Sequence, residues 1–233
     1  MQSGIRSTML LGKEKMDKLK NSRVAVFGVG GVGGYVAEAL ARIGLGTIAL
    51  IDNDRISESN INRQIIALKS TVGMYKTEVM KKRILDINPS AKVETFNMFY
   101  LPENADDFNI QNYDYIVDAV DTVSAKVELA VRAEALGVPI ISIMGTGNKL
   151  DATAFKVTDI YKTSGCPLAR VMRKELRDRG VKSLKVVYSE ETPIKPLFLA
   201  DGDKASTPGS ISYVPSVAGL IAAGEIIRGL AGV

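Results

Sequence analysis

The chain contains 233 residues, of which 46% are hydrophobic and 24% charged, enough apolar material for one large domain with a buried core. Its single cysteine, Cys166, excludes an internal disulfide and a paired Cys-x-x-Cys zinc site. With 30 Lys and Arg against 26 Asp and Glu, the net charge of +4 permits a polyanionic partner without requiring one.

Strand and helix patterns alternate through the first two thirds of the chain. The segment from Arg23 to Phe27 is a β-branched run without polar interruption, which predicts a buried strand. After an N-terminal arm or helix at 1–20, the predicted strands are 23–27, 47–51, 92–96, 115–117 and 139–142, and the predicted helices are 33–43, 74–87 and 124–136. This alternation predicts a Rossmann-like α/β fold, with a mostly parallel sheet and helices on both faces.

The pattern changes after residue 147 and predicts a C-terminal extension of the sheet. The expected elements are a strand at 154–160, a helix at 167–179, a strand at 185–188, a long surface loop at about 189–209 and a core helix at 214–230. We interpret 1–233 as a single domain, with a nucleotide-binding part at 21–147 and a substrate-side extension at 148–233.

No membrane span or export signal is predicted. The apolar part of the last helix is interrupted by Glu225 and Arg228 and is too short for a bilayer. Residues 1–20 lack the basic start and apolar middle of a signal peptide. We therefore expect a cytoplasmic protein.

The glycine-rich stretch after the first strand predicts a nucleotide site. Gly28, Gly30, Gly31 and Gly33 lie at a strand-to-helix turn, where glycine permits positive φ and lets backbone amides approach a phosphate. The helix that follows adds free N–H groups and the positive end of its dipole. The signal is that of generic nucleotide binding.

Polar residues after the second strand indicate which nucleotide binds. Asp52 ends that strand about where a ribose-binding acid is expected in a dinucleotide dehydrogenase. The cluster that follows, however, supplies donors suited to polyphosphate oxygens, and its members are Asn60, Asn62, Arg63 and Gln64. We therefore predict a triphosphate site in which Asp52 accepts the ribose hydroxyls. Asp54 would order this cluster, help to hold a metal, or simply form a turn.

Five motifs in this order resemble the ThiF/MoeB/HesA superfamily, the ubiquitin-activating-enzyme-like adenylating enzymes. They are Gly28-x-Gly-Gly-x-Gly, Asp52-x-Asp54, Asn60-x-Asn62-Arg63-Gln64, Lys76 and Asp118-x-x-Asp121. Three further stretches are similar to the tRNA threonylcarbamoyladenosine dehydratases of that superfamily: Thr71-Val72-Gly73, Asn88-Pro89 and Gly165-Cys166-Pro167-Leu168-Ala169.

This resemblance implies ATP-dependent ligase- or cyclase-type chemistry on tRNA. The threonyl carboxylate of threonylcarbamoyladenosine would be adenylated, and the ureido nitrogen would then close a cyclic hydantoin and release AMP. The implied cofactors are ATP and Mg²⁺, with a monovalent cation (Na⁺ or K⁺) as an open alternative. The implied partners are tRNA, a sulfur-transfer protein and a second copy of the chain. Arg6 would act in the ATP site of that second copy, and the alternative is that Arg6 belongs to a disordered terminus.

The candidate catalytic residues are Arg63, Lys76, Asp121 and Arg6, and the first two would neutralise the approach of a carboxylate to a phosphate. Arg63 has a planar fork that can grip phosphate oxygens in the transition state, and its alternative is a surface arginine. Lys76 is expected in the first turn of a helix, where a cation opposes the helix dipole. A bound anion would remove that conflict, and the resemblance implies a lysine near the phosphates.

Asp118 and Asp121 follow a strand at the edge where open α/β sheets bind ligands. Mg²⁺ takes one or two carboxylates in addition to phosphate oxygens and water. We predict that Asp121 faces the metal, and the alternative is an N-cap for the next helix. For Asp118 both roles stay open.

The main alternative function is adenylation of the C-terminal glycine of a ubiquitin-like sulfur carrier in thiamine or molybdopterin biosynthesis. The absence of zinc-binding cysteines counts against it. A nucleotide-binding protein without catalysis is less favoured, because Arg63, Lys76 and Asp121 are all present. A dinucleotide oxidoreductase is the last alternative, because the donor cluster after Asp52 suits a polyphosphate rather than a nicotinamide.

One feature is not explained by the nucleotide motifs. Arg170, Arg173, Lys174 and Arg177 have the i, i+3, i+4, i+7 spacing of one helix face. This basic stripe is either a contact for the tRNA backbone or a solvated helix face. Cys166, just before this helix, is interpreted as a buried cysteine because the chain has no His to activate it.

Overall fold

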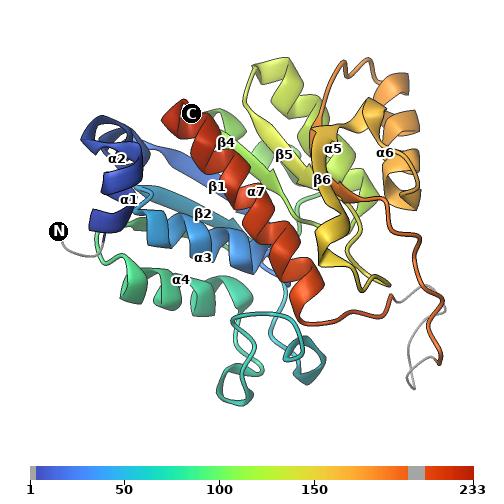
Figure 1. The fold of residues 1–233 in the computed structure, drawn as a ribbon, viewed down its shortest axis with the longest axis horizontal. Helices are drawn as coiled ribbons and strands as arrows, with labels where there is room; N and C mark the ends of the chain where they lie inside the picture. Colours follow the sequence, from blue (N-terminus) through green and yellow to red (C-terminus); the bar gives the residue numbers. More distant parts are fainter. Residues whose placement is uncertain (1–3, 199–207) are drawn as a thin grey trace.

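A seven-stranded sheet with the strand order β3-β2-β1-β4-β5-β7-β6 forms the centre of the fold (Figure 1). The computed structural model describes residues 4–198 and 208–233. Its strands are β1 Arg23–Phe27, β2 Thr47–Ile51, β3 Lys92–Phe96, β4 Tyr115–Asp118, β5 Ile140–Ile143, β6 Phe155–Asp159 and β7 Lys185–Ser189. Its α-helices are α1 Ile5–Leu11, α2 Lys13–Asn21, α3 Gly33–Ile43, α4 Lys76–Ile87, α5 Val123–Leu136, α6 Pro167–Asp178 and α7 Tyr213–Ala231.

Strand pairing confirms the predicted Rossmann-like sheet and its C-terminal extension. β1 pairs in parallel with β2 and β4, and the parallel pairing continues from β4 through β5 to β7. Only the edge strand β6 is antiparallel, to β7. Strands from the last third of the chain thus extend the same sheet.

Alternating side chains of the central strands bury both faces of the sheet. Val24 and Val26 of β1 belong to the core that packs under α3, α4 and α7, whereas Ala25 and Phe27 belong to the core under α5. This period of two is expected for a strand covered on both sides. Helices α3 and α7 cross one face, and α5 and α6 cover the other (Figure 1).

Element boundaries differ from the sequence prediction at a few ends. The helix predicted from residue 74 begins at Lys76, because Tyr75 is extended and forms an isolated bridge with Arg55. β4 includes Asp118, and α6 ends at Asp178. Of the predicted loop at 189–209, residues 199–207 lie outside the described part of the chain.

The last helix, α7, is the core helix that the sequence predicts. By length and mean hydropathy alone it could cross a membrane, but half of its apolar window is buried inside the protein. It packs most extensively on α3, where Gly219 lies so close to the backbone of Val32 that a Cβ would approach the Val32 carbonyl oxygen to 2.4 Å. Packing against other helices is typical of a core helix and not of a membrane-spanning helix.

Candidate active site

The carboxyl ends of the parallel strands open into a cleft of about 300 Å³. The cleft lies where the strand order reverses between β1 and β4, the position at which open α/β sheets bind ligands. Turns after β1, β2, β3, β4 and β5 line it, together with the segment before α4 and the start of α7. The predicted nucleotide site lies at this edge.

Two of the four predicted glycines are required by the backbone, and the other two face the cleft. Gly28 has φ +86°, and a Cβ there would lie 2.5 Å from the carbonyl oxygen of Ala119. Gly33 does not line the cleft; a Cβ on it would lie 1.8 Å from the carbonyl oxygen of Gly28. Gly30 and Gly31 line the cleft just before α3, whose first turn has no side-chain cap. An anion can therefore approach this helix terminus.

Asp52 joins the glycine turn to the segment after β2. Its carboxylate accepts hydrogen bonds from the amide of Val29 at 2.7 Å and from the amide of Asp54 at 2.8 Å. Burial raises the pKa of the Asp52 carboxyl above its ordinary value, although Lys76 and the two amides act in the opposite direction. The carboxylate is thus held at the wall of the cleft.

Lys76, the first residue of α4, is buried and paired with carboxylates of the chain. Its Nζ lies 2.6 Å from Asp54 Oδ2 and 3.8 Å from Asp52 Oδ2. These carboxylates offset the conflict with the helix dipole, so a bound anion is not needed for that purpose. Asp54 is therefore paired with Lys76, and its roles in ordering the Asn60 to Gln64 cluster or in holding a metal stay predictions.

Arg63 is a half-buried cation at the cleft, and no carboxylate of the described residues pairs with it. Its Nη1 donates to the carbonyl oxygen of Ser59 and to Oδ1 of Asn62, each at 2.9 Å. Burial lowers the pKa of the guanidinium, and within the described part of the chain no acidic side chain counteracts this. Since arginine stays protonated in proteins, its charge is available to an anion.

Asn60 and Asn62 face different ways, although the sequence predicts both as nucleotide ligands. Asn60, at the end of a short 3₁₀ helix, lines the cleft, whereas Asn62 does not. The Asn62 Nδ2 donates to the carbonyl oxygen of Ser210 at 3.0 Å, and its Oδ1 accepts from Arg63. Because both ends of this amide are used by the chain, Asn62 orients Arg63 and ties it to the segment before α7.

Gln64 presents an unpaired amide oxygen at the cleft. The residue is buried, and its Oε1 has no hydrogen-bond partner among the described residues. Its Nε2 lies against Gly30, where an added Cβ would be 3.7 Å away. A buried polar atom without a partner calls for a ligand or a water. Gln64 can therefore bind a group that lies beside the glycine turn.

Asp121 is exposed at the cleft and forms no ion pair with the described residues. In the described chain its side chain receives one hydrogen bond, at 3.3 Å from the hydroxyl of Thr122. It does not cap α5, because the N-cap position is occupied by Thr122. No cluster of three or more His, Cys, Asp or Glu within residues 4–198 and 208–233 forms a metal site by itself. A metal here would need oxygens from a ligand, which suits Mg²⁺ with a polyphosphate.

Asp118 is fully buried, so both roles left open for it by the sequence are wrong. Lys126 Nζ lies 3.0 Å from each of its carboxylate oxygens and 2.8 Å from the carbonyl oxygen of Ile143. The Ser142 hydroxyl donates to the same carboxylate. Sequence reasoning missed Lys126, because a lysine in a helix is normally exposed. The ion pair fixes the turn that leads to Asp121.

The wall after β3 is a second feature that sequence reasoning missed. Met98, Phe99 and Tyr100 line the cleft there, and Ala119 and Val120 line it after β4. Their only signal in the sequence is a position directly after a predicted strand of the sheet. This apolar wall suits the flat ring of a base.

Arg6 lies on α1, exposed and outside the cleft of its own chain. A role for it in catalysis would require a second copy of the chain, and it stays a prediction.

Comparisons with known proteins agree with this geometry. Residues 5–233 match the ThiF family. A relative named tRNA threonylcarbamoyladenosine dehydratase from Bacillus subtilis (strain 168) is 44% identical, over 97% of this chain and 93% of its own length. One with the same name from Escherichia coli (strain K12) is 33% identical, over 94% of this chain and 90% of its own length.

Solved structures give the same result. The crystal structure of E. coli tRNA N6-threonylcarbamoyladenosine dehydratase in complex with AMP has a TM-score of 0.91 and 33% identity, covering 99% of this chain and 94% of that chain. The structure of that protein in complex with ATP has a TM-score of 0.90 and 32% identity, with the same coverage. These structures bear out the Rossmann-like fold.

Proposed function

Because this chain belongs to the ThiF family, we propose that it is an ATP-dependent tRNA threonylcarbamoyladenosine dehydratase. The substrate rests on the relatives of that name, which match this chain over nearly their whole length. The chemistry rests on one observation above all: Arg63 is a half-buried cation in the cleft that contains the glycine turn, and no Asp or Glu among residues 4–198 and 208–233 pairs with it.

In the first step a carboxylate oxygen of the threonyl group attacks the α-phosphorus of ATP. A bond forms between that oxygen and the phosphorus, and the bond from the phosphorus to the pyrophosphate oxygen breaks. Two anions must meet, so the step needs a cation that is not already neutralised. Arg63 meets this need, whereas Lys76 is shared with Asp54 and Asp52.

The remaining residues of the cleft bind and orient the nucleotide. The amides of the glycine turn and the start of α3 face the phosphates, and Asp52 accepts the ribose hydroxyls. The unpaired oxygen of Gln64 accepts a further donor from the nucleotide or its water, and the wall after β3 covers the base. Asp121 would hold Mg²⁺, which supplies positive charge to the phosphate oxygens when bound.

In the second step the ureido nitrogen attacks the acyl carbon of the adenylate. A carbon–nitrogen bond closes the hydantoin ring, the bond between the acyl carbon and the AMP oxygen breaks, and the nitrogen loses its proton. The substrate thereby loses the elements of water, whose oxygen leaves on AMP. Since the chain contains no His, the proton goes to a carboxylate, to AMP or to water.

Several features of the proposal go beyond the chemistry of one chain. We infer a homodimer in which Arg6 reaches the partner's cleft, and a cytoplasmic location. We also infer a single-domain organisation, which the one continuous sheet supports. A monovalent cation and a sulfur-transfer partner stay open predictions. No observation favours the alternative substrate, a ubiquitin-like sulfur carrier.

Mass spectrometry of nucleosides tests the proposal. Transfer RNA that contains threonylcarbamoyladenosine is incubated with the protein, ATP and Mg²⁺, and ATP is omitted in the control. We expect the modified nucleoside to lose the mass of one water only when ATP is present, with one AMP released per nucleoside. An unchanged nucleoside would redirect the search to ubiquitin-like carriers, tested by pyrophosphate release.

A further inference from the structure

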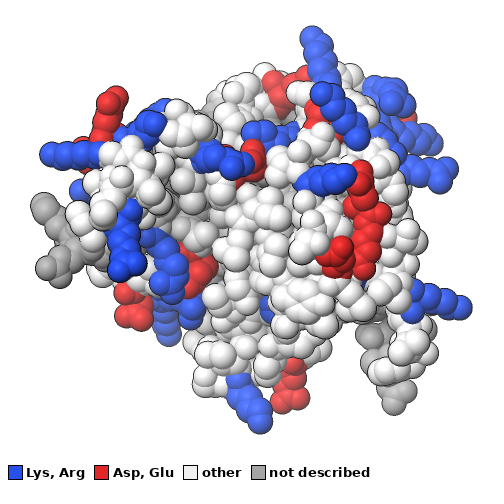
Figure 2. Space-filling view, in the orientation of Figure 1, with Lys and Arg blue, Asp and Glu red and all other residues white. Residues whose placement is uncertain are grey.

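The basic stripe on α6 is exposed, and its charge is not neutralised by ion pairs with the described residues. Arg170, Lys174 and Arg177 have the spacing i, i+4, i+7, lie on one face of the helix and are all exposed. Among the described residues none of the three forms an ion pair with an Asp or Glu, nor is Asp178 on the flank of the stripe paired. Figure 2 shows Lys and Arg side chains gathered at the edge where Figure 1 places α6.

Two neighbouring arginines, Arg173 and Arg179, form contacts within the chain, unlike the three cations of the stripe. Arg173, the fourth member of the predicted stripe, is half-buried and donates to the carbonyl oxygen and hydroxyl of Thr163. Arg179 pairs with Glu175 at 2.7 Å. Arg173 therefore positions the segment before α6 and is not part of the exposed stripe, which consists of Arg170, Lys174 and Arg177.

Helix α6 begins at the same edge of the sheet as the cleft. The Ser164 hydroxyl, just before α6, lies 3.3 Å from Glu190, just after the carboxyl end of β7. Helix α6 packs on α5, which begins directly after Asp121 and Thr122 of the cleft. The stripe therefore starts at the same edge of the sheet as the cleft, near the end of β7, and extends along α6 for about 10 Å, at 1.5 Å per residue.

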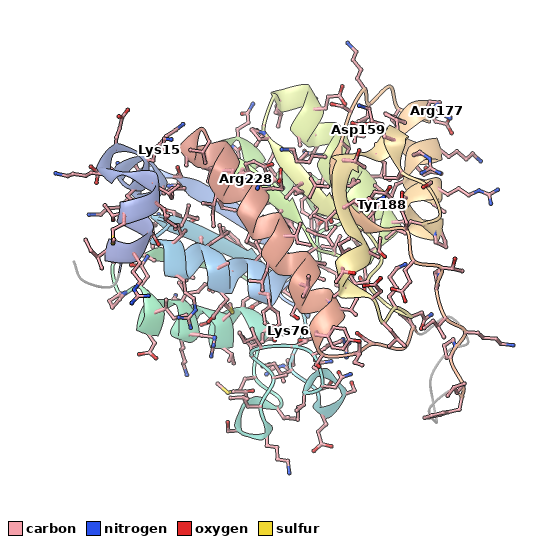
Figure 3. All side chains as sticks on the ribbon, viewed as in Figure 1. Lys15, Lys76, Asp159, Arg177, Tyr188 and Arg228 are labelled. Atoms are coloured by element: carbon pink, nitrogen blue, oxygen red, sulfur yellow. The ribbon has the colours of Figure 1, made fainter. Side chains whose placement is uncertain are left out.

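A fourth cation, Lys162, and an aromatic ring, Tyr161, lie next to the stripe. The guanidinium of Arg177 lies over the ring of Tyr161 at 5.6 Å, which holds it at the helix surface. Lys162, next to that tyrosine, is exposed. Figure 3 labels Arg177 on the outer side of α6, away from the sheet.

We propose that this face of α6 binds the phosphate backbone of the tRNA whose modified base enters the cleft. The proposal rests on the proposed function, because that function requires an RNA much larger than the cleft. A row of cations without carboxylate partners displaces condensed counterions when it binds the phosphates of a nucleic acid. The release of these counterions is the main source of affinity in such complexes. These contacts would position the RNA without reading its sequence.

An acidic protein is a weaker fit to the same face. Protein interfaces have an apolar centre with aromatic or aliphatic anchors. On α6 the one large apolar side chain that is exposed is Val171. A row of cations without an apolar centre favours a polyanion.

Neutralisation of the stripe tests the proposal. The variant Arg170→Gln, Lys174→Gln, Arg177→Gln keeps helix propensity, since Gln, Lys and Arg are nearly equivalent in helices. The matched control is Lys13→Gln, Lys18→Gln, Lys20→Gln on α2, whose three lysines are also exposed. Helix α2, marked by Lys15 in Figure 3, lies at the opposite end of the molecule from α6. Size-exclusion chromatography verifies that both variants elute as the wild type does.

The readouts separate RNA binding from chemistry. For the stripe variant we expect tRNA affinity to fall by on the order of tenfold to a hundredfold at moderate salt, and the salt dependence of log K to flatten by about 0.7 to 0.9 for each lost contact. The KM for tRNA should rise in parallel, while the KM for ATP stays unchanged. The control variant should behave as the wild type does.

Equal tRNA affinity and salt dependence in the stripe variant and the wild type would overturn the proposal, and the face would then suit an acidic protein instead. A similar loss in the control variant would also overturn it, because net charge alone would explain the effect. Direct binding of tRNA is measured without turnover. A failure of this proposal is therefore distinct from a failure of the dehydratase assignment, in which the wild type itself leaves the nucleoside unchanged.

Discussion

The two cations of the cleft differ in how their charge is balanced. Lys76 lies within 2.6 Å of Asp54 and is buried, so its charge is largely used by the chain. Among the residues that the structure describes, Arg63 donates only to neutral acceptors, the Ser59 carbonyl and the Asn62 amide. In our account Lys76 orders the site, and Arg63 stabilises the charge that develops during adenylation.

Removal of the Arg63 guanidinium should therefore affect chemistry far more than folding. We expect Arg63→Ala to lower kcat by about 10³-fold, since an arginine that stabilises a phosphoryl transition state contributes 10³ or more. Arg63→Lys keeps the charge without the fork and should be intermediate. AMP release gives the rates, and thermal unfolding should show a nearly unchanged Tm. An Arg63→Ala protein with wild-type activity would overturn this assignment.

Asp121 should determine the response to magnesium. In Asp121→Asn the exposed carboxylate is lost without disturbing an ion pair, so we expect a normal Tm and a Mg²⁺ requirement raised at least tenfold for turnover. Titration of MgCl₂ at saturating ATP measures this. If the Mg²⁺ dependence stays at the wild-type value, the metal belongs at another carboxylate, and Asp52 and Asp54 are the other two that line the cleft.

Protonation of Asp52 should raise the KM for ATP at acid pH. Its pKa is raised by burial, so as pH falls the carboxyl becomes protonated earlier than an exposed Asp and loses its capacity to accept from the ribose. Because the pKa of Asp52 is higher in the folded state than in the unfolded state, protonation of Asp52 favours folding. Its contribution to stability is present below the unfolded pKa and is lost as pH rises through the folded pKa. The KM should therefore rise at acid pH without any unfolding contributed by Asp52.

The variant Asp52→Asn provides the comparison for that pH profile. It cannot titrate at this position, so its KM should be raised but flat over the same range. Steady-state kinetics measure both KM profiles from pH 8 down to the lowest pH at which circular dichroism shows that the proteins are folded. A rise in KM at acid pH that persists in Asp52→Asn would assign it to another group.

At the scale of elements, local pattern was sufficient for most of the sheet. Strands β1, β2 and β3 have the predicted bounds, because each is a short run of mostly β-branched and apolar residues between turn residues. Side-chain direction was not predictable in the same way. Asn62 points to Ser210 and Asp118 points into the core, because contacts with residues distant in sequence decide both directions.

The buried pair of Asp118 and Lys126 joins β4, β5 and α5 beneath the cleft. Asp118→Asn would leave the Lys126 ammonium buried without its counterion, which typically costs about 3–5 kcal/mol. The double variant Asp118→Leu, Lys126→Met removes both charges and should recover most of that loss. Urea unfolding measures the free energies. A double variant as unstable as Asp118→Asn would mean that the ion pair itself, and not the unpaired charge, sets the cost.

At the scale of the whole molecule, the sequence motifs predicted which edge of the sheet holds the site. Asp52, Lys76 and Asp121 come from separate elements, and the parallel topology brings them to one cleft. The role of Arg6 could not be predicted from one chain, because α1 lies outside the cleft of its own chain. Only an assembly can connect the two.

A mixture of inactive variants tests whether the cleft is shared. Arg6→Ala and Arg63→Ala should each have little activity alone. If Arg6 acts in the partner's cleft, each mixed dimer contains one cleft with both arginines, so random exchange should restore about a quarter of wild-type activity. Activity is measured after the two proteins are unfolded and refolded together. No recovery despite mixed dimers on native mass spectrometry would contradict action in trans.

The fate of the carboxylate oxygen tests the central claim most directly. The substrate is tRNA whose threonylcarbamoyladenosine carries ¹⁸O in both carboxylate oxygens. It is incubated with ATP, Mg²⁺ and the protein, and the masses of all products are measured by mass spectrometry. The account predicts one ¹⁸O in AMP, none in pyrophosphate, and one retained in the cyclised nucleoside. Label in orthophosphate, with ADP as the nucleotide product, would mean attack at the γ-phosphate and would contradict adenylation.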